Sequence, residues 1–161
     1  MTNQIYLTLF GEQDLSDIFE IQKDLRSAEM RQAMGVPSTL SDVEEWLENK
    51  RTIQSSRNFT LGVRLINTRQ IVGYVTLKSL ETDMFSAEVG IVMNFTKGKG
   101  YGGEALNRLE RLACFSFGYS TIIANVLTIN TKALSFFDKN SYTRVLEMGD
   151  HIIFKKVLTQ F

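Results

Sequence analysis

Four glycines and two lysines precede an amphipathic segment in the stretch NFTKGKGYGGEALNRLE, residues 94–110. Glycines lack the side chains that would keep a ligand away from the backbone, and consecutive amide N–H groups can then point into one concavity. The helix expected to begin near Tyr101 adds the positive end of its dipole, equivalent to about half an elementary charge. Lys97 and Lys99 add further attraction for an anion. The stretch therefore predicts a loop that holds phosphate groups.

Two general phosphate-binding motifs fit this stretch poorly. A P-loop requires Gly-x-x-x-x-Gly-Lys-Ser/Thr, and the sequence contains no such string. The dinucleotide fingerprint Gly-x-Gly-x-x-Gly is matched by Gly98, Gly100 and Gly103, but it expects an acidic residue about 20 positions further on. The following strand offers Asn125 and no carboxylate. Dinucleotide binding is thus a weak alternative, and a glycine-rich turn without a ligand is another.

A third interpretation comes from two motifs taken together. Lys97, Gly100 and Gly102 form Lys-x-x-Gly-x-Gly, and residues 130–142, NTKALSFFDKNSY, follow after one predicted helix and one predicted strand. The first string resembles the Gln/Arg-x-x-Gly-x-Gly/Ala signature of the GNAT acetyltransferase superfamily, whose loop wraps the pyrophosphate of acetyl-coenzyme A. The second resembles the superfamily's later motif, Asn-x-x-Ala-x-x-x-Tyr-x-Lys-x-Gly-Phe.

The later motif departs from the usual pattern at two positions, because Phe137 stands where tyrosine is usual and Ser141 where glycine is usual. Residues 87–93, AEVGIVM, look like the fourth strand of the superfamily. Residues 30–48 resemble the amino-terminal helices of the branch that acetylates the amino termini of ribosomal proteins. The positions of the later motif that agree in type are Asn130, Ala133, Lys139 and Tyr142.

The resemblance implies an acetyl-CoA-dependent N-acetyltransferase, an acyltransferase that needs no metal. The acceptor would be a primary amine, either a peptide or protein amino terminus or a small amine, which attacks directly in a ternary complex. The implied fold is α+β, with a mixed, mostly antiparallel sheet of about seven strands flanked by about four helices and splayed between strands 4 and 5. Through this gap the backbone of residues 91–93 would pair with the pantetheine arm like an added strand. The implied cofactor-binding residues are Ile91, Val92, Met93, Lys97, Gly98, Lys99, Gly100, Tyr101, Gly102, Gly103, Asn130, Phe137 and Lys139.

Glu88 is the candidate general base. An alkyl amine has a pKa of about 10 and a peptide α-amine one of about 8, so a base helps to free the nitrogen lone pair. Glu88 lies in the predicted fourth strand, where related enzymes often carry a glutamate that relays a proton through water. The alternative is an ordinary charged residue on the solvated face of a strand.

Phe137 bears on how well the protein could turn over substrate. The tyrosine often found at this position donates a proton to the departing sulfur, and a phenyl ring has no hydroxyl to donate. Ala133, Phe136 and Phe137 have the i, i+3, i+4 spacing of a core stripe, so we expect core packing beside the cofactor. Phe137, together with the missing carboxylate at Asn125, motivates the alternative of a non-catalytic acyl-CoA-binding module.

Four other residues have simple structural explanations. His151, the single histidine, falls on the closing hairpin and is expected to be a surface or packing residue. Cys114 is expected to be a small buried apolar residue, and Trp46 to pack the amino-terminal helices. Asn130 could bond the cofactor's pantetheine arm or cap the helix behind it, and both roles can hold together.

The elements that must position these residues begin with a predicted strand over residues 5–10. A helix is expected from Asp14, and a second one from a capping box formed by Ser41 and Glu44. Three strands follow over residues 58–65, 71–80 and 85–95, and the segments between them are short enough for hairpins. These strands predict an antiparallel meander before the glycine loop.

After the glycine loop we expect a helix of about four turns, then a buried strand over 121–127, a short helix over 130–139 and a hairpin that turns near Gly149. The order predicts one β-loop-α-β crossover in the middle of the chain. In the helix, the predicted solvent face consists of Glu104, Arg108, Glu110 and Arg111, and the predicted apolar stripe of Ala105, Leu106, Leu109, Leu112 and Ala113.

Composition sets the remaining limits. The chain has 161 residues and 18 basic against 18 acidic side chains, so its net charge gives no reason to expect a nucleic-acid or membrane partner. One cysteine excludes an internal disulfide and a cysteine-cluster zinc site. No window approaches the ~20 apolar residues of a membrane span, and no signal peptide is recognisable. We therefore expect a single cytoplasmic domain over residues 1–161, and the sequence leaves monomer and homodimer open.

Overall fold

The computed structural model describes residues 4–23, 39–52, 54–55, 57–94, 97 and 100–158. Residues 30–38, part of the segment that resembles the amino-terminal helices, lie outside this part of the chain, as do Gly98 and Lys99. The elements are β1 (Ile5–Thr8), the short 3-10 helix η1 (Glu12–Asp14), α1 (Leu15–Lys23), α3 (Leu40–Thr52), β2 (Asn58–Leu65), β3 (Ile71–Ser79), β4 (Ser86–Met93), α4 (Gly102–Arg111), the π-helical turn η2 (Leu112–Ser116), β5 (Thr121–Leu127), α5 (Thr131–Lys139), β6 (Thr143–Met148) and β7 (His151–Val157).

The strands form one seven-stranded sheet in the order β1-β2-β3-β4-β5-β7-β6. β1 to β4 pair in antiparallel fashion, β4 and β5 are parallel, and β5, β7 and β6 are again antiparallel. The parallel pair needs a crossover, which α4 supplies. The predicted α+β class, the meander, the crossover and the closing hairpin are all confirmed.

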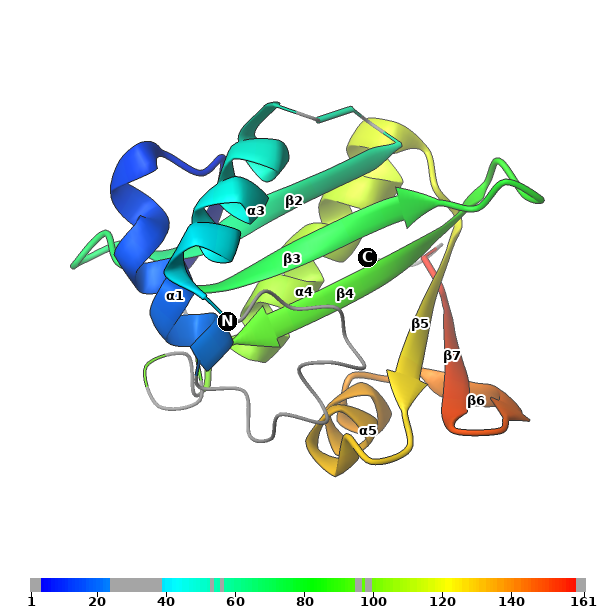
Figure 1. Ribbon diagram of the computed structural model, residues 1–161. Coiled ribbons are helices and arrows are strands. Elements are labelled where there is room, and N and C mark those ends of the chain that lie inside the picture. The colour runs from blue at the N-terminus through cyan, green and yellow to red at the C-terminus, as the bar shows by residue number, and fades with distance from the viewer. Residues whose placement is uncertain are drawn as a thin grey trace.

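β4 and β5 separate soon after they meet. Their ladder has its last register pair at Glu88↔Ile123, although β4 continues to Met93 and β5 to Leu127. Figure 1 shows β5 turning away from β4 toward α5. The predicted splay between strands 4 and 5 is therefore confirmed.

Two apolar clusters hold the helices against the two faces of the sheet. α1 and α3 lie in front of the sheet in Figure 1 and α4 lies behind it. On the front, Ile18 and Ile21 of α1 and Val43 of α3 pack with Tyr74 of β3. On the other face, buried side chains of α4 and α5 share one cluster with those of β2 to β5 and β7. The separated ends of β4 and β5 are thus held in place from both sides.

The helix α4 departs most strongly from its predicted pattern at its last acidic residue. Glu110, expected on the solvent face, is only 1% exposed. Its carboxylate accepts hydrogen bonds from the Tyr142 hydroxyl at 2.8 Å and from the Lys156 ammonium at 3.1 Å. These partners lie 32 and 46 residues away, so the helical pattern alone could not reveal them. Burial, reinforced by the Glu110 charge, raises the pKa of Tyr142 far above that of an ordinary phenol. The apolar stripe itself is confirmed, with four residues exposed by 1% or less: Ala105, Leu106, Leu109 and Ala113.

The start of α3 also differs from the prediction. The helix begins at Leu40, and the Thr39 hydroxyl oxygen accepts a hydrogen bond from the Asp42 backbone N–H at 3.1 Å. Thr39 thus has the capping role that the sequence pattern assigned to Ser41, and the capping-box prediction is wrong. A threonine two positions before the expected cap provides the same chemistry, so the spacing alone did not distinguish them.

In the part of the chain that the structure describes, no helix is long and apolar enough to cross a membrane.

Candidate active site

A cavity of about 270 Å³ lies where β4 and β5 separate. Its walls are residues 89–92 of β4 and residues 124–127 of β5, with Asn130, Ala133 and Phe137 closing it on the side of α5. Trp46 and Lys50 of α3 line it from the front of the sheet. The cavity therefore joins the gap between the two strands to the face that α3 covers.

Gly90 leaves the wall of this cavity without a side chain. A Cβ at Gly90 would lie 2.6 Å from the Thr76 hydroxyl oxygen, so even alanine requires a neighbour to move. Along β4, alternate residues face the same side of the sheet. Val92 packs against the α1–α3 cluster, and Gly90 consequently opens backbone on that same side. A ligand can approach the β4 backbone closely at this position.

Three glycines of the predicted loop, Gly100, Gly102 and Gly103, lie in the described part of the turn before α4. Gly100 has φ of +90°, a backbone conformation that favours glycine. Gly102 begins α4, and a Cβ on it would lie 3.0 Å from the Phe136 ring. Gly103 follows, with Asn140 3.4 Å from its Cβ position, and Tyr101 is the half-buried residue before the helix. The glycines thus allow the amino terminus of α4 to lie against α5.

Two lysines of the predicted cofactor site, Lys97 and Lys139, lie in the described part of the chain and are placed differently from one another. The Lys97 backbone N–H donates to Asn94 Oδ1 at 3.0 Å, which shapes the turn. The Lys97 ammonium lies 3.1 Å from the carboxylate of Glu20 on α1. Lys139 is exposed at the carboxyl end of α5 and does not line the cavity. In this state Lys97 therefore ties the turn to α1.

Glu88 is half-buried at the point where the β4–β5 ladder ends. It lies two residues before Gly90 and on the same face of β4, because side chains alternate along a strand. Its register partners are Lys78 on β3 and Ile123 on β5. Glu88 does not line the cavity itself and lies next to its end.

Phe137 is both a core residue and a cavity residue. It is 3% exposed, and its ring centroid lies 5.0 Å from that of Tyr142, 5.3 Å from that of Phe136 and 5.6 Å from that of Phe154. It also lines the cavity. The nearby Tyr142 hydroxyl is held by Glu110, so it does not replace the hydroxyl that Phe137 lacks.

Two further cavity residues have polar groups with identified roles. Asn130 caps α5, because its Oδ1 accepts from the Ala133 N–H at 3.2 Å, and it also lines the cavity. Burial raises the pKa of Tyr74 to about 12, so this phenol stays protonated and is not a candidate base. The Trp46 ring lies 5.0 Å from that of Tyr74, in agreement with the predicted packing role of the tryptophan.

Sequence reasoning missed one polar pair at the cavity. His151 Nδ1 lies 2.8 Å from Asn125 Oδ1, and His151 Nε2 lies 3.3 Å from Asp150 Oδ1. Asn125 lines the cavity from β5, and His151 begins β7, the neighbouring strand. The two residues are 26 positions apart, and their contact depends on the antiparallel register of β5 and β7. The predicted hairpin covers β6 and β7 only, so the sequence pattern gave no signal for a contact between β5 and β7.

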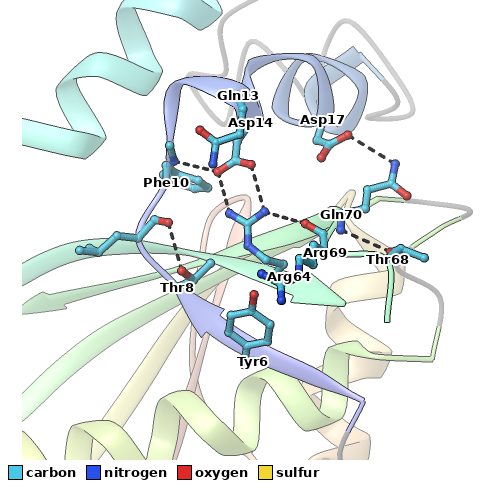
Figure 2. Close-up of a pocket in the computed structure, with 12 residues that line it drawn as sticks. Tyr6, Thr8, Phe10, Gln13, Asp14, Asp17, Arg64, Thr68, Arg69 and Gln70 are labelled. Atoms are coloured by element: carbon cyan, nitrogen blue, oxygen red, sulfur yellow. Dashed lines mark hydrogen bonds and ion pairs between the residues drawn. The ribbon is translucent and has the colours of Figure 1, made fainter. Parts of the chain in front are cut away.

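A second hollow, of about 770 Å³, lies beside β1, η1 and the β2–β3 turn. Figure 2 shows Arg64 reaching Asp14, whose two oxygens it contacts at 2.8 and 3.1 Å. Arg64 also donates to the Arg69 carbonyl at 2.6 Å, and Asp17 accepts from the Ile71 N–H at 3.1 Å. These charges already have partners within the protein, so the larger hollow is not our candidate site.

Comparison with known proteins agrees with this geometry. Residues 4–143 match the family model described as an acetyltransferase (GNAT) domain. The structure is similar to a GNAT-family acetyltransferase from Bacillus anthracis, with a TM-score of 0.83, 18% identity, and coverage of 99% of this chain and 98% of that chain. A Vibrio cholerae protein assigned as a ribosomal-protein-serine acetyltransferase gives a TM-score of 0.81 at 15% identity, with coverage of 98% of this chain and 95% of that chain. The dodecameric spermidine N-acetyltransferase from Vibrio cholerae gives a TM-score of 0.72 at 18% identity, with coverage of 98% of this chain and 96% of that chain. No curated protein sequence matches the chain.

The fold and the family match together define an acyltransferase. The chain belongs to the GNAT acetyltransferase family. Members of this family use acetyl-CoA, and membership decides against the dinucleotide-binding alternative. Among the described residues, no group of three or more histidine, cysteine or acidic side chains is placed to hold a metal ion.

Proposed function

We propose that the chain is one N-acetyltransferase domain that transfers the acetyl group of acetyl-CoA to a primary amine, which attacks directly in a ternary complex. The observation that carries this proposal is the cavity between the separated ends of β4 and β5, next to the glycine turn at the amino terminus of α4. Acetyl-CoA supplies an acetyl group already activated as a thioester. The amine nitrogen forms a bond to the acetyl carbon, the C–S bond breaks, and the amine gives up one proton.

The chain fits the donor on two grounds. The β4 backbone over residues 91–93 has no partner on β5 beyond Glu88, so its peptide groups can pair with the amides of the pantetheine arm. Gly100 and Gly102 keep the turn before α4 free of side chains, and the positive end of the helix favours the diphosphate there. Asn130 and Phe137 line the cavity from α5, where they would contact the arm. Gly98 and Lys99 remain expected parts of the loop that binds the diphosphate, and Lys139 remains an expected cofactor-binding residue. The Lys97 ammonium would leave the Glu20 carboxylate and bind the diphosphate.

Glu88 is the proposed base. It lies at the end of the ladder and on the same sheet face as Gly90, which places its carboxylate beside the cavity rather than within it. A water molecule between Glu88 and the amine therefore carries the proton in our proposal. The protein also needs little help for the departing sulfur, because a thiol has a pKa of about 8.5 and its thiolate is a stable leaving group. Acetyl transfer is therefore possible with Phe137, which has no hydroxyl to protonate the sulfur.

The acceptor is proposed to be a peptide amino terminus or a small amine. The α3 side of the cavity carries the Lys50 ammonium, 5.9 Å from the centre of the Trp46 ring, and a polycation would be repelled there. The equal numbers of acidic and basic residues also give no field that would steer a polycation toward the site. Substrates with one amine and an apolar or uncharged neighbour suit these walls better than polyamines.

Thiol release measured with acetyl-CoA and a panel of amines tests the proposal. The panel contains peptides with different amino-terminal residues, small monoamines and spermidine, and mass spectrometry confirms an added acetyl group. We expect turnover with a peptide or monoamine and little with spermidine. Binding of CoA without turnover across the panel would contradict the proposed transfer, and the preference for spermidine would contradict the proposed acceptor class.

A further inference from the structure

Asp150, His151 and Asn125 form a short polar chain that ends in the cavity. Asp150 Oδ1 lies 3.3 Å from His151 Nε2, and His151 Nδ1 lies 2.8 Å from Asn125 Oδ1. Asn125 lies on the same face of the sheet as Glu88, because Glu88 and Ile123 are register partners and Asn125 is two residues further along β5. This face carries the proposed base and is open to the cavity, so the Asn125 amide is placed on the acceptor side.

The contacts of His151 depend on its charge. In the structure both ring nitrogens face oxygen acceptors, Asp150 on one side and the Asn125 carbonyl on the other. An imidazolium ring satisfies both, since both nitrogens then carry a hydrogen. A neutral ring carries one hydrogen, which the Asp150 carboxylate attracts to Nε2. Nδ1 is then an acceptor and needs a donor. The Asn125 amide must therefore rotate so that its Nδ2 donates to Nδ1.

Asn125 therefore presents one of two opposite groups to the cavity. When His151 is neutral, Nδ2 faces the ring and the carbonyl oxygen is left for a ligand; when His151 is protonated, Oδ1 faces the ring and the amide N–H is left. Only the carbonyl oxygen can accept a hydrogen bond from an amine N–H. We propose that His151 is a positioning residue that sets the orientation of the Asn125 amide, and that neutral His151 makes Asn125 the group that receives the acceptor amine. This inference rests on the proposed N-acetyltransferase function.

The register partners of His151 are Leu127 on β5 and Met148 on β6, which are uncharged. Among the described residues, the charged groups on this side of the sheet are Asp150 in the turn, Lys155 further along the same face of β7, Glu88 beyond Asn125, and Lys50 on α3 across the cavity. Of these, Asp150 is the one in contact with the ring, and it favours the hydrogen on Nε2.

Nuclear magnetic resonance tests the orientation without any turnover. His151 is the single histidine of the chain, so the imidazole nitrogen signals of ¹⁵N-labelled protein belong to one residue. The same signals show at each pH whether the ring is neutral or charged. We expect the Nε2–H tautomer in the neutral ring. The Nδ1–H tautomer in the neutral ring would overturn the inference, because Asn125 would then keep its oxygen toward His151 in both states.

Kinetics of wild type and His151→Gln test the role in acetyl transfer. Glutamine can still bond Asn125 but does not titrate, and the ionisation of the amine itself cancels when the two proteins are compared at each pH. We expect the ratio of wild-type to variant KM for the amine to rise about tenfold between the pH at which the spectra show a neutral ring and the pH at which they show a charged ring, the effect of replacing one hydrogen bond by two opposed donors. KM for acetyl-CoA should differ between the two proteins by less than about twofold.

The outcomes separate this inference from the function on which it rests. A constant ratio of KM values, or a change in KM for acetyl-CoA in place of the amine, overturns the role of His151 while leaving acetyl transfer intact. Absence of transfer by wild-type protein refutes the proposed function and the acceptor role together. In Asn125→Asp, a carboxylate oxygen faces the cavity whether His151 is neutral or protonated. The ratio of the KM for the amine in Asn125→Asp to that in His151→Gln should therefore be independent of pH.

Discussion

The hollow beside β1 and the cavity between β4 and β5 differ in how their polar groups are used. In the larger one, Arg64, Asp14 and the Arg69 carbonyl bind one another, and Asp14 is only 2% exposed. In the smaller one, the β4 backbone beyond Glu88 has no strand partner on β5, and the wall at Gly90 carries no side chain. The larger hollow has about three times the volume, at 770 Å³ against 270 Å³.

This difference shows that volume alone does not locate a site. The charges of the larger hollow hold η1 and α1 against the β2–β3 turn, as Figure 2 shows, and a ligand there would have to compete with them. The smaller cavity exists because two neighbouring strands stop pairing while both continue. A chain that leaves backbone hydrogen-bonding groups without a strand partner is expected to supply another partner, and here a ligand can do so.

The largest expected effect is on stability, in the larger hollow. Asp14→Ala leaves Arg64, itself 11% exposed, without its partner, and we expect a loss of about 3 kcal/mol in the free energy of unfolding. Urea denaturation measures it. Asp138→Ala removes an exposed ion pair with Arg144 whose N–O distance is equally short, and it should lower the free energy of unfolding much less. CoA affinity of the folded Asp14→Ala protein should equal that of wild type, and a weakened affinity would break the distinction between the two hollows.

The next effect concerns the smaller cavity. Gly90→Val places three carbon atoms against Thr76 and into the cavity, and we expect kcat/KM to fall by about 100-fold, because a small displacement of the reacting groups has an effect of that size. Gln13→Val adds apolar bulk to the larger hollow and serves as the matched control. Equal losses in the two variants would mean that the smaller cavity has no special role.

Glu88→Gln sharpens the account of the same cavity. We expect kcat to fall by about tenfold at pH 7, less than for a base in direct contact, because the proton passes through water. The acidic limb of the pH–rate profile should disappear as well. A variant that keeps both the rate and the acidic limb would remove Glu88 from the mechanism and leave it as a surface residue of β4.

The smallest effect is expected at Phe137. Phe137→Tyr adds a hydroxyl that can protonate the departing sulfur, and we expect kcat to rise by about threefold, since the thiolate leaves readily without help. The dissociation constant of CoA, measured by calorimetry, should stay the same. An unchanged or lower kcat would show that the ring serves packing alone.

Most of the fold could be predicted from local pattern. β5 was predicted with its observed bounds, because its apolar run is followed by Asn130 and the cap of the next helix. The hairpins around β3 followed from the short turns between apolar strands. The start of α3 was placed wrongly, because Thr39 and Ser41 are both good caps and the local pattern does not choose between them.

The sequence located the parts of the candidate site that follow one another along the chain. The glycine turn and residues 91–93 belong to one strand–loop–helix unit, and their binding of the coenzyme stays a prediction. Glu110 was assigned to solvent because its partner Lys156 comes from β7, 46 residues away. The pairing of Asn125 with His151 likewise depends on strand register rather than on either residue's neighbours in sequence. Contacts between distant strands are the part that sequence patterns did not supply.

Calorimetric titration of the purified protein with CoA and with acetyl-CoA tests the central claim most directly. We predict saturable, equimolar binding of both to wild-type protein, retained in Gln13→Val and lost or strongly weakened in Gly90→Val. If folded wild-type protein gives no heat with either compound, the gap between β4 and β5 does not hold the coenzyme and the account is wrong.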